Sequence, residues 1–449
     1  MKRSNWHYLW SSHDIRRMIL VTIAILSIYR LAAHVPVPGV NRQAIEQILN
    51  SGGAGGTLFG LLDLLSGGTV SNFSVLAMGV YPYITAQIIL QLLVPIIPAL
   101  QKRMEEDPRE GQKWMEKWTY ILAVPMAALQ AIGQINIFNQ FSGGIPILTG
   151  FGFIQGSILY SLTVVLSMTA GTMFAIWLGE LISEYGIRNQ GLSLIIFAGI
   201  VSRIPAGFVQ IMADEQNRWW LLALTLIITL LTIFAIVFVQ QGRRNIPVMY
   251  PGRRVGNRMS MPVKGTLPLM VNMAGMIPLI FAQSLLTFPA ILASFFANSG
   301  IPWVRNISTS LQNLFGGNSD AYWIMYFLMV VGFTFFYTNV LFAQQNYGEN
   351  LKRVGAQIPG VSRGAPTQKY LNRVLSRITL PGALFLGTIA VLPWLIGLII
   401  PALRAAPSSS IFLVSSAGLL IVVGVVRDTF FNIQAELKLH GYDDAVLIR

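Results

Sequence analysis

The chain has 449 residues, of which 54% are hydrophobic and 11% charged, a balance that excludes an ordinary soluble globular protein. It carries a net charge of +13 and no cysteine, which excludes a disulfide framework and thiol chemistry. Its histidines lie far apart and outside the long apolar runs, so we expect no metal site; they are His7, His13, His34 and His440. The composition predicts an all-α polytopic membrane protein, because β-barrel spans alternate in segments of about ten residues.

The first apolar run, residues 18–33, follows a basic segment that contains Lys2, Arg3, Arg16 and Arg17. A basic segment before an apolar run is also typical of a cleaved signal peptide. Many further apolar runs follow, and the next residues, HVPVPG, look structural. We therefore expect this run to be retained as the first span.

A short apolar segment, residues 58–65, comes next, with glycines on both sides at 52, 53, 55, 56, 67 and 68. It is too short to cross a bilayer, which takes about 20 helical residues. Directly behind it, residues 70–100 form a long run without charges. This order predicts a re-entrant helix on glycine hinges. Because irregular backbone at membrane depth needs protein or a water-filled cavity beside it, we also expect a cavity there.

Ten apolar runs are expected to span the membrane. They are residues 18–33, 73–95, 118–138, 153–178, 192–212, 219–239, 268–296, 322–342, 378–400 and 410–426. Prolines within the seventh run, Pro278 and Pro289, predict kinks there. Polar loops are expected at 101–117 and 180–191.

The basic residues decide the orientation. With ten spans both termini lie on one side, and most Lys and Arg fall on that side; the exceptions are Arg30, Arg42, Arg203, Arg218, Arg305 and Arg404. The positive-inside rule therefore places both termini in the cytoplasm.

Two basic loops, about residues 240–266 and 343–377, are longer than a simple turn and contain Gly and Pro. One interpretation is that their charges only orient the neighbouring helices. The other is that they form structured cytoplasmic protrusions for an acidic or anionic partner such as ribosomal RNA.

Five spans followed by five more predict two inverted halves, residues 1–215 and 216–449, with a transport pathway between them. The chain contains no catalytic motif of the kinds that mark hydrolases, metalloproteases or nucleotide-binding enzymes, so we do not expect an enzyme. The spans also lack the midplane carboxylates that ion-coupled transporters use.

Branched aliphatic residues instead recur in the spans, at Val80, Ile84, Ile196, Ile280 and Ile421. Val80 and Ile84 are four residues apart and share one helix face. The simple interpretation is core packing or lipid contact. The other is a ring that blocks ions by dewetting and yields to a wider polymer.

Several motifs closely resemble the SecY family, the channel subunits of the bacterial Sec protein translocon, and the likeness extends over essentially the whole chain. They are HVPVPG at 34–39, LLSGG at 64–68, MGVYPYI at 78–84, GTMF at 171–174 with WLGE at 177–180, IIFAGIV at 195–201, VNMAG at 271–275, FYT at 336–338 and RITLPGA at 377–383. Two departures stand out. The family's usual PGIRPG reads PGVSRG at 359–364, and its usual GIGNG reads GIRNQG at 186–191.

This resemblance implies a passive protein-conducting channel of the bacterial inner membrane. Such a channel passes unfolded secretory polypeptides and releases transmembrane segments laterally into lipid. The segment at about 57–67 corresponds to the plug, with Leu58, Phe59, Leu61, Leu62, Asp63, Leu64 and Leu65 as its side chains. The five aliphatic residues correspond to the pore ring, and spans two, three, seven and eight to the lateral gate.

The resemblance also implies partners. The basic loops correspond to the docking surface for the SecA motor ATPase and the ribosome, through Arg243, Arg244, Arg253, Arg254, Arg258, Lys352, Arg353 and Arg363. SecE is expected as a clamp and SecG as an accessory subunit, and no cofactor is expected. The rival hypothesis is a small-solute secondary transporter with inverted repeats, which requires an ionisable site at the midplane.

Overall fold

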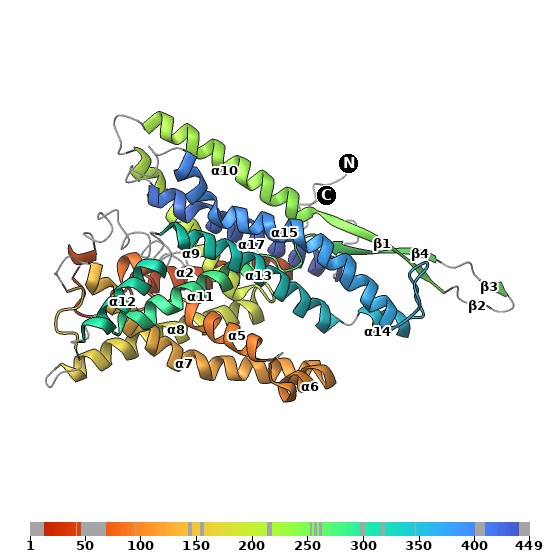
Figure 1. The fold of residues 1–449 in the computed structure, drawn as a ribbon, viewed down its shortest axis with the longest axis horizontal. Helices are drawn as coiled ribbons and strands as arrows, with labels where there is room; N and C mark the ends of the chain where they lie inside the picture. The colour runs from red at the N-terminus through yellow and green to blue at the C-terminus, as the bar shows by residue number, and fades with distance from the viewer. Residues whose placement is uncertain are drawn as a thin grey trace.

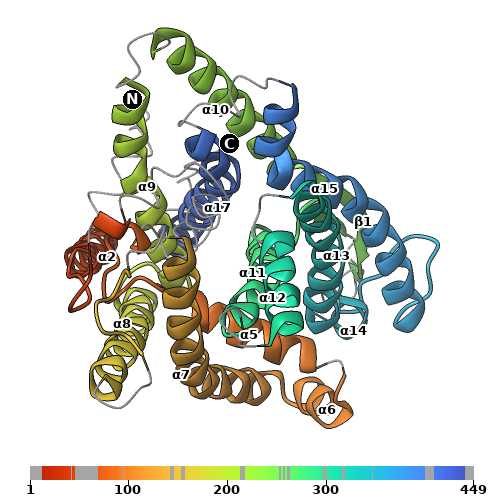
Figure 2. The same cartoon turned by 60° about the vertical axis from the view of Figure 1, so that its left-hand side comes forward.

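The computed structural model describes residues 13–41, 43–45, 69–94, 96–141, 146–152, 157–212, 218–251, 254–255, 258–259, 263–296, 301–315, 319–345, 347–399 and 409–439. Long helices form the body of the molecule, and a β-hairpin projects from one end (Figure 1). Figure 2 shows α2, α7 and α8 on one side and α13, α14 and α15 on the other.

Each of the ten expected spans overlaps a helix. In chain order these are α2 (His13–Ala32), α5 (Tyr81–Leu93), α7 (Pro108–Phe141), α8 (Ile158–Tyr185), α9 (Gly191–Met212), α10 (Arg218–Gln241), α11 (Ile277–Ser294), α13 (Asp320–Gln345), α15 (Ala365–Ile399) and α17 (Ser409–Leu439). Among the described residues, seven helices are long and apolar enough to cross a membrane, or eight if one bent pair counts as a span. The protein is thus a multi-pass helical membrane protein, and the count of ten stays a prediction.

The second helix begins later than predicted. Residues 73–80 form turns rather than helix, after a 3₁₀ turn at Val70–Asn72, and α5 begins at Tyr81. Phe73 and Gly79 have positive φ angles of 41° and 51°, which a helix does not allow. Pro82 lies in the first turn of α5, where a missing N–H does no harm.

The predicted loop at 101–117 is wrong, because the chain there is helical. A short helix, α6 (Pro98–Glu106), lies at 97° to α5, and α7 begins at Pro108. Lys, Arg, Met, Glu and Gln, which dominate this stretch, are good helix formers. The Asp107 carboxylate accepts hydrogen bonds of 3.2 Å from the N–H groups of Arg109 and Glu110, as an N-cap does.

The first basic loop folds into strands. β1 (Arg243–Tyr250) pairs antiparallel with β4 (Val263–Met270), and β2 (Arg254–Val255) pairs with β3 (Arg258–Met259) beyond them. Ile246 and Val248 are buried, with exposed neighbours between them, which is the period of a half-buried strand. They join a second apolar cluster with Leu371 and Leu375 of α15. The seventh span therefore starts at residue 277 and not at 268.

Two further helices cover expected loops. α12 (Pro302–Phe315) lies between α11 and α13, and α14 (Tyr347–Arg353) lies in the second basic loop. α15 already begins at Ala365, so the irregular part of that loop is residues 354–364. α14 is short and polar and α12 is short and amphipathic, and neither has the long apolar run by which spans are found.

Alanine in place of Gly171 is expected to destabilise the fold. An added Cβ would lie 2.1 Å from the Val75 carbonyl oxygen, where α8 packs against the turns before α5. Overpacking of this kind costs about 1–3 kcal/mol. Thermal unfolding of the full chain in detergent should show a lower midpoint.

Gly332→Ala is the matched control in α13, because an added Cβ there has nothing within 4 Å. It should leave the midpoint unchanged or raise it slightly, since alanine favours a helix over glycine by about 0.5–1 kcal/mol. Equal midpoints for the two variants would contradict the close contact at Gly171.

Candidate functional site

The five aliphatic residues lie in one buried cluster contributed by four helices. Val80 caps the start of α5, Ile84 is in its first turn, and the others lie on α9, α11 and α17. Their side chains are between 1% and 8% exposed, and all five belong to the main apolar core. Contact with lipid is thereby excluded for them. Buried aliphatic side chains are expected of a closed constriction and of ordinary packing alike.

The short segment expected to close the channel, Leu58 to Leu65, lies outside the described residues. The chain resumes at Thr69, which is fully buried and donates a hydrogen bond of 2.6 Å to the Leu76 carbonyl. The described chain after the segment is therefore fixed in the core directly before the aliphatic residues.

A polar seam runs between α5, α7 and α11, beside the aliphatic cluster. The Tyr81 hydroxyl on α5 donates to the Ser284 carbonyl on α11 at 3.1 Å. The Gln130 amide on α7 donates to the Thr85 hydroxyl at 3.2 Å. Tyr81 and Thr85 flank Ile84 on one side of the seam, and Ser284 lies one helical turn after Ile280 on the other.

The seam is incompletely hydrogen-bonded. On α7 and α11 several buried polar atoms have no partner among the described residues: Oε1 of Gln130 and Gln134, both amide atoms of Gln283, and the Ser284 hydroxyl. A buried polar atom without a partner costs about 1–3 kcal/mol. These helices are therefore held together less tightly than a fully satisfied or wholly apolar interface would hold them.

Packing at the two ends of α11 is closer. An added Cβ on Gly133 of α7 would lie 2.3 Å from Ile291, and the Ser294 hydroxyl donates to the Gly133 carbonyl at 3.3 Å. On the other side Phe281 packs edge-on against Phe333 and Tyr337 of α13, with centroids 6.1 and 5.8 Å apart. α11 thus has an aromatic contact with α13 and a partly polar one with α5 and α7.

The sequence analysis does not predict this polar contact between α5, α7 and α11. The sequence does contain an indication of polar contacts, because glutamines occur within apolar runs at 130, 134 and 283. A glutamine in a span indicates a polar contact but does not identify the partner, and only the packed helices show that the Gln130 amide reaches Thr85 of α5.

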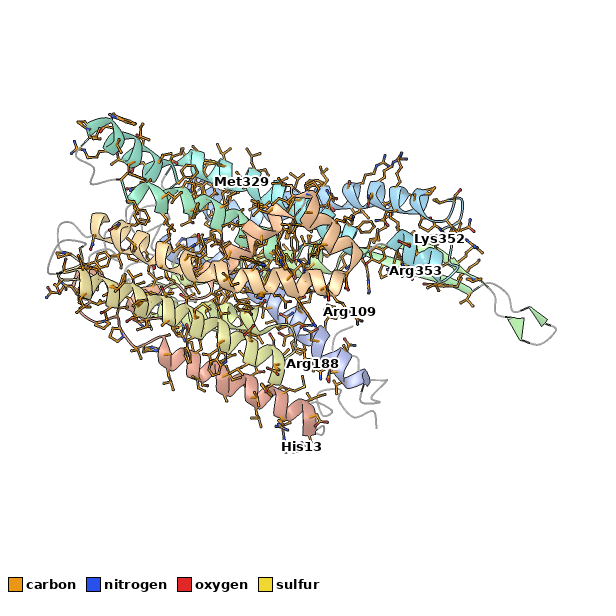
Figure 3. All side chains as sticks on the ribbon, turned by 90° about the horizontal axis from the view of Figure 1, so that it is seen from below. His13, Arg109, Arg188, Met329, Lys352 and Arg353 are labelled. Carbon is orange, nitrogen blue, oxygen red and sulfur yellow. The ribbon has the colours of Figure 1, made fainter. Side chains whose placement is uncertain are left out.

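The basic residues lie at one end of the molecule. Arg243 and Arg244 are exposed at the start of β1, and Arg363 is exposed in the irregular part of the second loop. Figure 3 shows Lys352 and Arg353 next to the hairpin, with Arg109 and Arg188 toward the same end. Arg353 pairs with Glu349 at 3.4 Å, an exposed contact that contributes little stability. The side chains of Arg253, Arg254 and Arg258 lie outside the described part.

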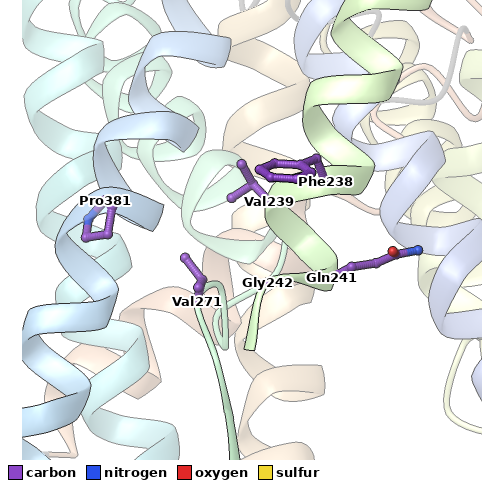
Figure 4. Close-up of a pocket in the computed structure, with 6 residues that line it drawn as sticks. All are labelled: Phe238, Val239, Gln241, Gly242, Val271 and Pro381. Carbon is purple, nitrogen blue, oxygen red and sulfur yellow. The ribbon is translucent and has the colours of Figure 1, made fainter. Parts of the chain in front are cut away.

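A pocket of about 440 Å³ lies at the base of the hairpin, and no predicted site residue lines it (Figure 4). Its lining is mostly apolar and comes from the end of α10, the start of the hairpin and α15: Phe238, Val239, Gln241, Gly242, Val271 and Pro381. Among the described residues there is no group of three or more His, Cys, Asp or Glu side chains that would hold a metal ion.

Comparisons with known proteins agree on one family. The sequence model of the SecY family matches residues 74–430. The chain is 36% identical over 440 residues to the protein translocase subunit SecY of Streptomyces galbus, and 38% identical over 440 residues to that of Mycobacterium tuberculosis (strain CDC 1551 / Oshkosh). Both alignments cover 96% of this chain and 96% of the relative.

Two solved structures share the fold. A protein-conducting channel and a SecY protein with a plug domain that stabilises its closed state each give a TM-score of 0.62 at 18% identity. Each comparison covers 96% of this chain and 94% of the other.

Two variants should shift stability in opposite directions if the seam is bonded as described. Gln283→Leu removes a buried amide that lacks partners and keeps the volume, so the free energy of unfolding should rise by about 1–3 kcal/mol. Tyr81→Phe removes the bond to Ser284 and should lower it by about 0.5–1.5 kcal/mol. Denaturant unfolding in detergent measures both, and a loss of stability in Gln283→Leu would contradict the description of the seam.

Proposed function

This chain belongs to the SecY family, and we propose that it is the central subunit of a protein-conducting channel in the bacterial cell membrane. It has ten spans in two inverted halves, residues 1–215 and 216–449, with both termini in the cytoplasm. The predominance of apolar helices and the basic end of the molecule support this placement. The transporter hypothesis has no support in the comparisons, since the relatives are translocase subunits.

The observation that carries the proposal is the aliphatic cluster beside the incompletely bonded seam. Val80, Ile84, Ile196, Ile280 and Ile421 form the pore ring, whose side chains are buried together. In the closed state an apolar ring excludes water and ions by dewetting. Because the ring residues come from four helices, the opening widens when those helices separate.

The lateral gate is the seam. α5 and α7 form one side of it, and α11 with α13 the other. Side-chain hydrogen bonds cross between the two sides at the Tyr81 hydroxyl, which donates to Ser284, and at the Ser294 hydroxyl, which donates to Gly133. Separating the sides breaks these bonds and frees polar atoms that already lack partners among the described residues. A translocating segment that is apolar enough then partitions through the gap into lipid, and a polar segment continues through the ring.

The plug of the proposed channel is the segment at about 57–67. Its length, its apolar side chains and its glycine flanks support this assignment. It is tethered at Thr69, which is buried in the core next to the turns that lead to Val80.

The hairpin and the second basic loop form the docking surface for a SecA motor and for the ribosome. The Met249 N–H donates to the Gln357 carbonyl at 2.8 Å, and the Gln357 N–H donates back at 2.9 Å, so the two loops support each other. A rigid basic surface suits a large anionic partner. SecE and SecG are the proposed membrane partners, and the apolar surface of α10, whose span is only 11% buried, suits such single helices.

Site-specific crosslinking tests the gate. The chain has no cysteine, so single cysteines are clean probes. An arrested translocating chain should crosslink through its signal segment to Ser284→Cys at the seam, and through its polar part to Ile84→Cys at the ring. Ser27→Cys on the exposed face of α2 is the control and should stay unlabelled. Absence of crosslinks at both seam and ring, or equal labelling of the control, would refute the channel.

A charge reversal tests the docking surface. Arg363→Glu should reduce motor-driven export several-fold, because it places a negative charge on the basic end, and should affect cotranslational insertion less. Arg363→Lys keeps the positive charge at the same exposed position, so it is the matched control and should leave export nearly unchanged. Equal loss of export in both variants would argue against a docking role for Arg363.

A further inference from the structure

We infer that α12 is an interfacial anchor that lies in the surface of the phospholipid leaflet on the side opposite the β-hairpin, with Trp303, Ile307 and Leu311 inserted among the lipid chains. These three residues are called the α12 stripe below. The inference concerns a lipid-binding surface and does not depend on channel activity.

The chain connectivity determines at which face of the membrane α12 lies. β4 leads into the start of α11, so the end of α11 at Ser294 lies at the face of the membrane away from the hairpin. α12 follows at that face, and α13 begins at Asp320, after four intervening residues. At roughly 3.5 Å per residue this connection spans less than about 20 Å, so α12 lies near the membrane face at which α13 begins. Figure 1 shows α12 and the hairpin at opposite ends of the molecule.

The helix has three distinct faces. Residues 303, 307 and 311 follow one another at intervals of four and therefore share one face. Ser308 and Gln312 are 3% and 7% exposed and face the protein. The remaining arc carries Asn306, Thr309, Ser310 and Asn313, all exposed and polar. A helix that lies in the plane of the membrane interface while packed on a protein has one face against the protein, one against lipid and one in water.

The arrangement reverses the rule for a helix on a soluble protein. The polar side chain of Ser308 points inward and donates to the Ala293 carbonyl near the end of α11. The apolar stripe points outward, with Trp303 66%, Ile307 52% and Leu311 36% exposed. Exposure of such an apolar stripe to water is unfavourable, whereas contact with lipid chains is favourable.

Neighbouring groups favour lipid over a second protein as the occupant. Phe295 and Phe296 at the end of α11 are also exposed, so apolar surface continues from the span toward α12. Trp303 is of the type enriched at membrane interfaces, where an apolar ring and a polar N–H each find a suitable medium. Within α12 the single charged residue is Arg305, whose guanidinium suits the phosphate level of the leaflet.

Anchoring α12 also holds the outer end of α11. Ser308 binds the Ala293 carbonyl, and the adjacent Ser294 binds Gly133 of α7. The depth of α12 in the leaflet therefore sets the depth of this end of α11, while the polar seam near its start remains free to part.

Depth-dependent fluorescence quenching tests the anchor. Ile307→Cys and Thr309→Cys place probes two residues apart on α12, about 200° apart around its axis at roughly 100° per residue. Each full chain, purified with the subunits that accompany it, is labelled with a nitrobenzoxadiazole probe and placed in phosphatidylcholine–phosphatidylglycerol nanodiscs. Nanodiscs leave both faces open to solutes. Leu311→Cys and Asn313→Cys form a second pair in case one variant fails to fold.

Doxyl groups on the lipid chains should quench the probes at 307 and 311 several-fold more than those at 309 and 313. Iodide in the buffer should show the reverse order. Equal responses within each pair would overturn the inference. Protection of 307 and 311 from both quenchers would overturn it as well, because a protein surface and not lipid would then cover the α12 stripe.

Discussion

Inside a membrane each polar group must find its partner within the protein, and the interface between α5, α7 and α11 meets this demand only in part. Tyr81 and Gln130 bridge the helices, while both amide atoms of Gln283 are buried without partners among the described residues. A wholly apolar interface would hold these helices together more stably, and so would one in which every polar group has a hydrogen-bond partner. The partly bonded interface is therefore weaker than either of these, and the more closely packed contacts of the bundle surround it.

The surrounding contacts limit where the bundle can open. At the end of α11, Gly133 allows α7 to approach Ile291 so closely that no side chain fits between them. Phe281 fixes α11 to α13 through aromatic edges. These contacts fix α11 to α13 near its start and to α7 near its end, and they leave the polar interface as its least completely bonded side.

Hydropathy was sufficient to locate the helices of the bundle, because long apolar runs have few alternatives in a membrane. It failed where polar sequence decides the structure. The stretch 101–117 is helical because its residues favour helix and Asp107 caps it, and α12 lacks a continuous apolar run. The aliphatic ring is predicted by family resemblance alone, since neither the spacing nor the burial of its residues distinguishes it from core packing. The buried glutamines of α7 and α11 are visible in the sequence, but the contact of Gln130 with Thr85 depends on how α5 and α7 pack.

The base of the hairpin has a mechanical consequence. The Val271 N–H donates to the Gly242 carbonyl at 2.9 Å, which ties the end of α10 to the approach to α11. An added Cβ on Gly382 of α15 would lie 2.5 Å from the Val271 carbonyl oxygen, so the backbone of α15 is in close contact with the same residue. Val271 is therefore held from both sides, and the base of the projecting strands is fixed to the end of α10 and to α15 through backbone atoms.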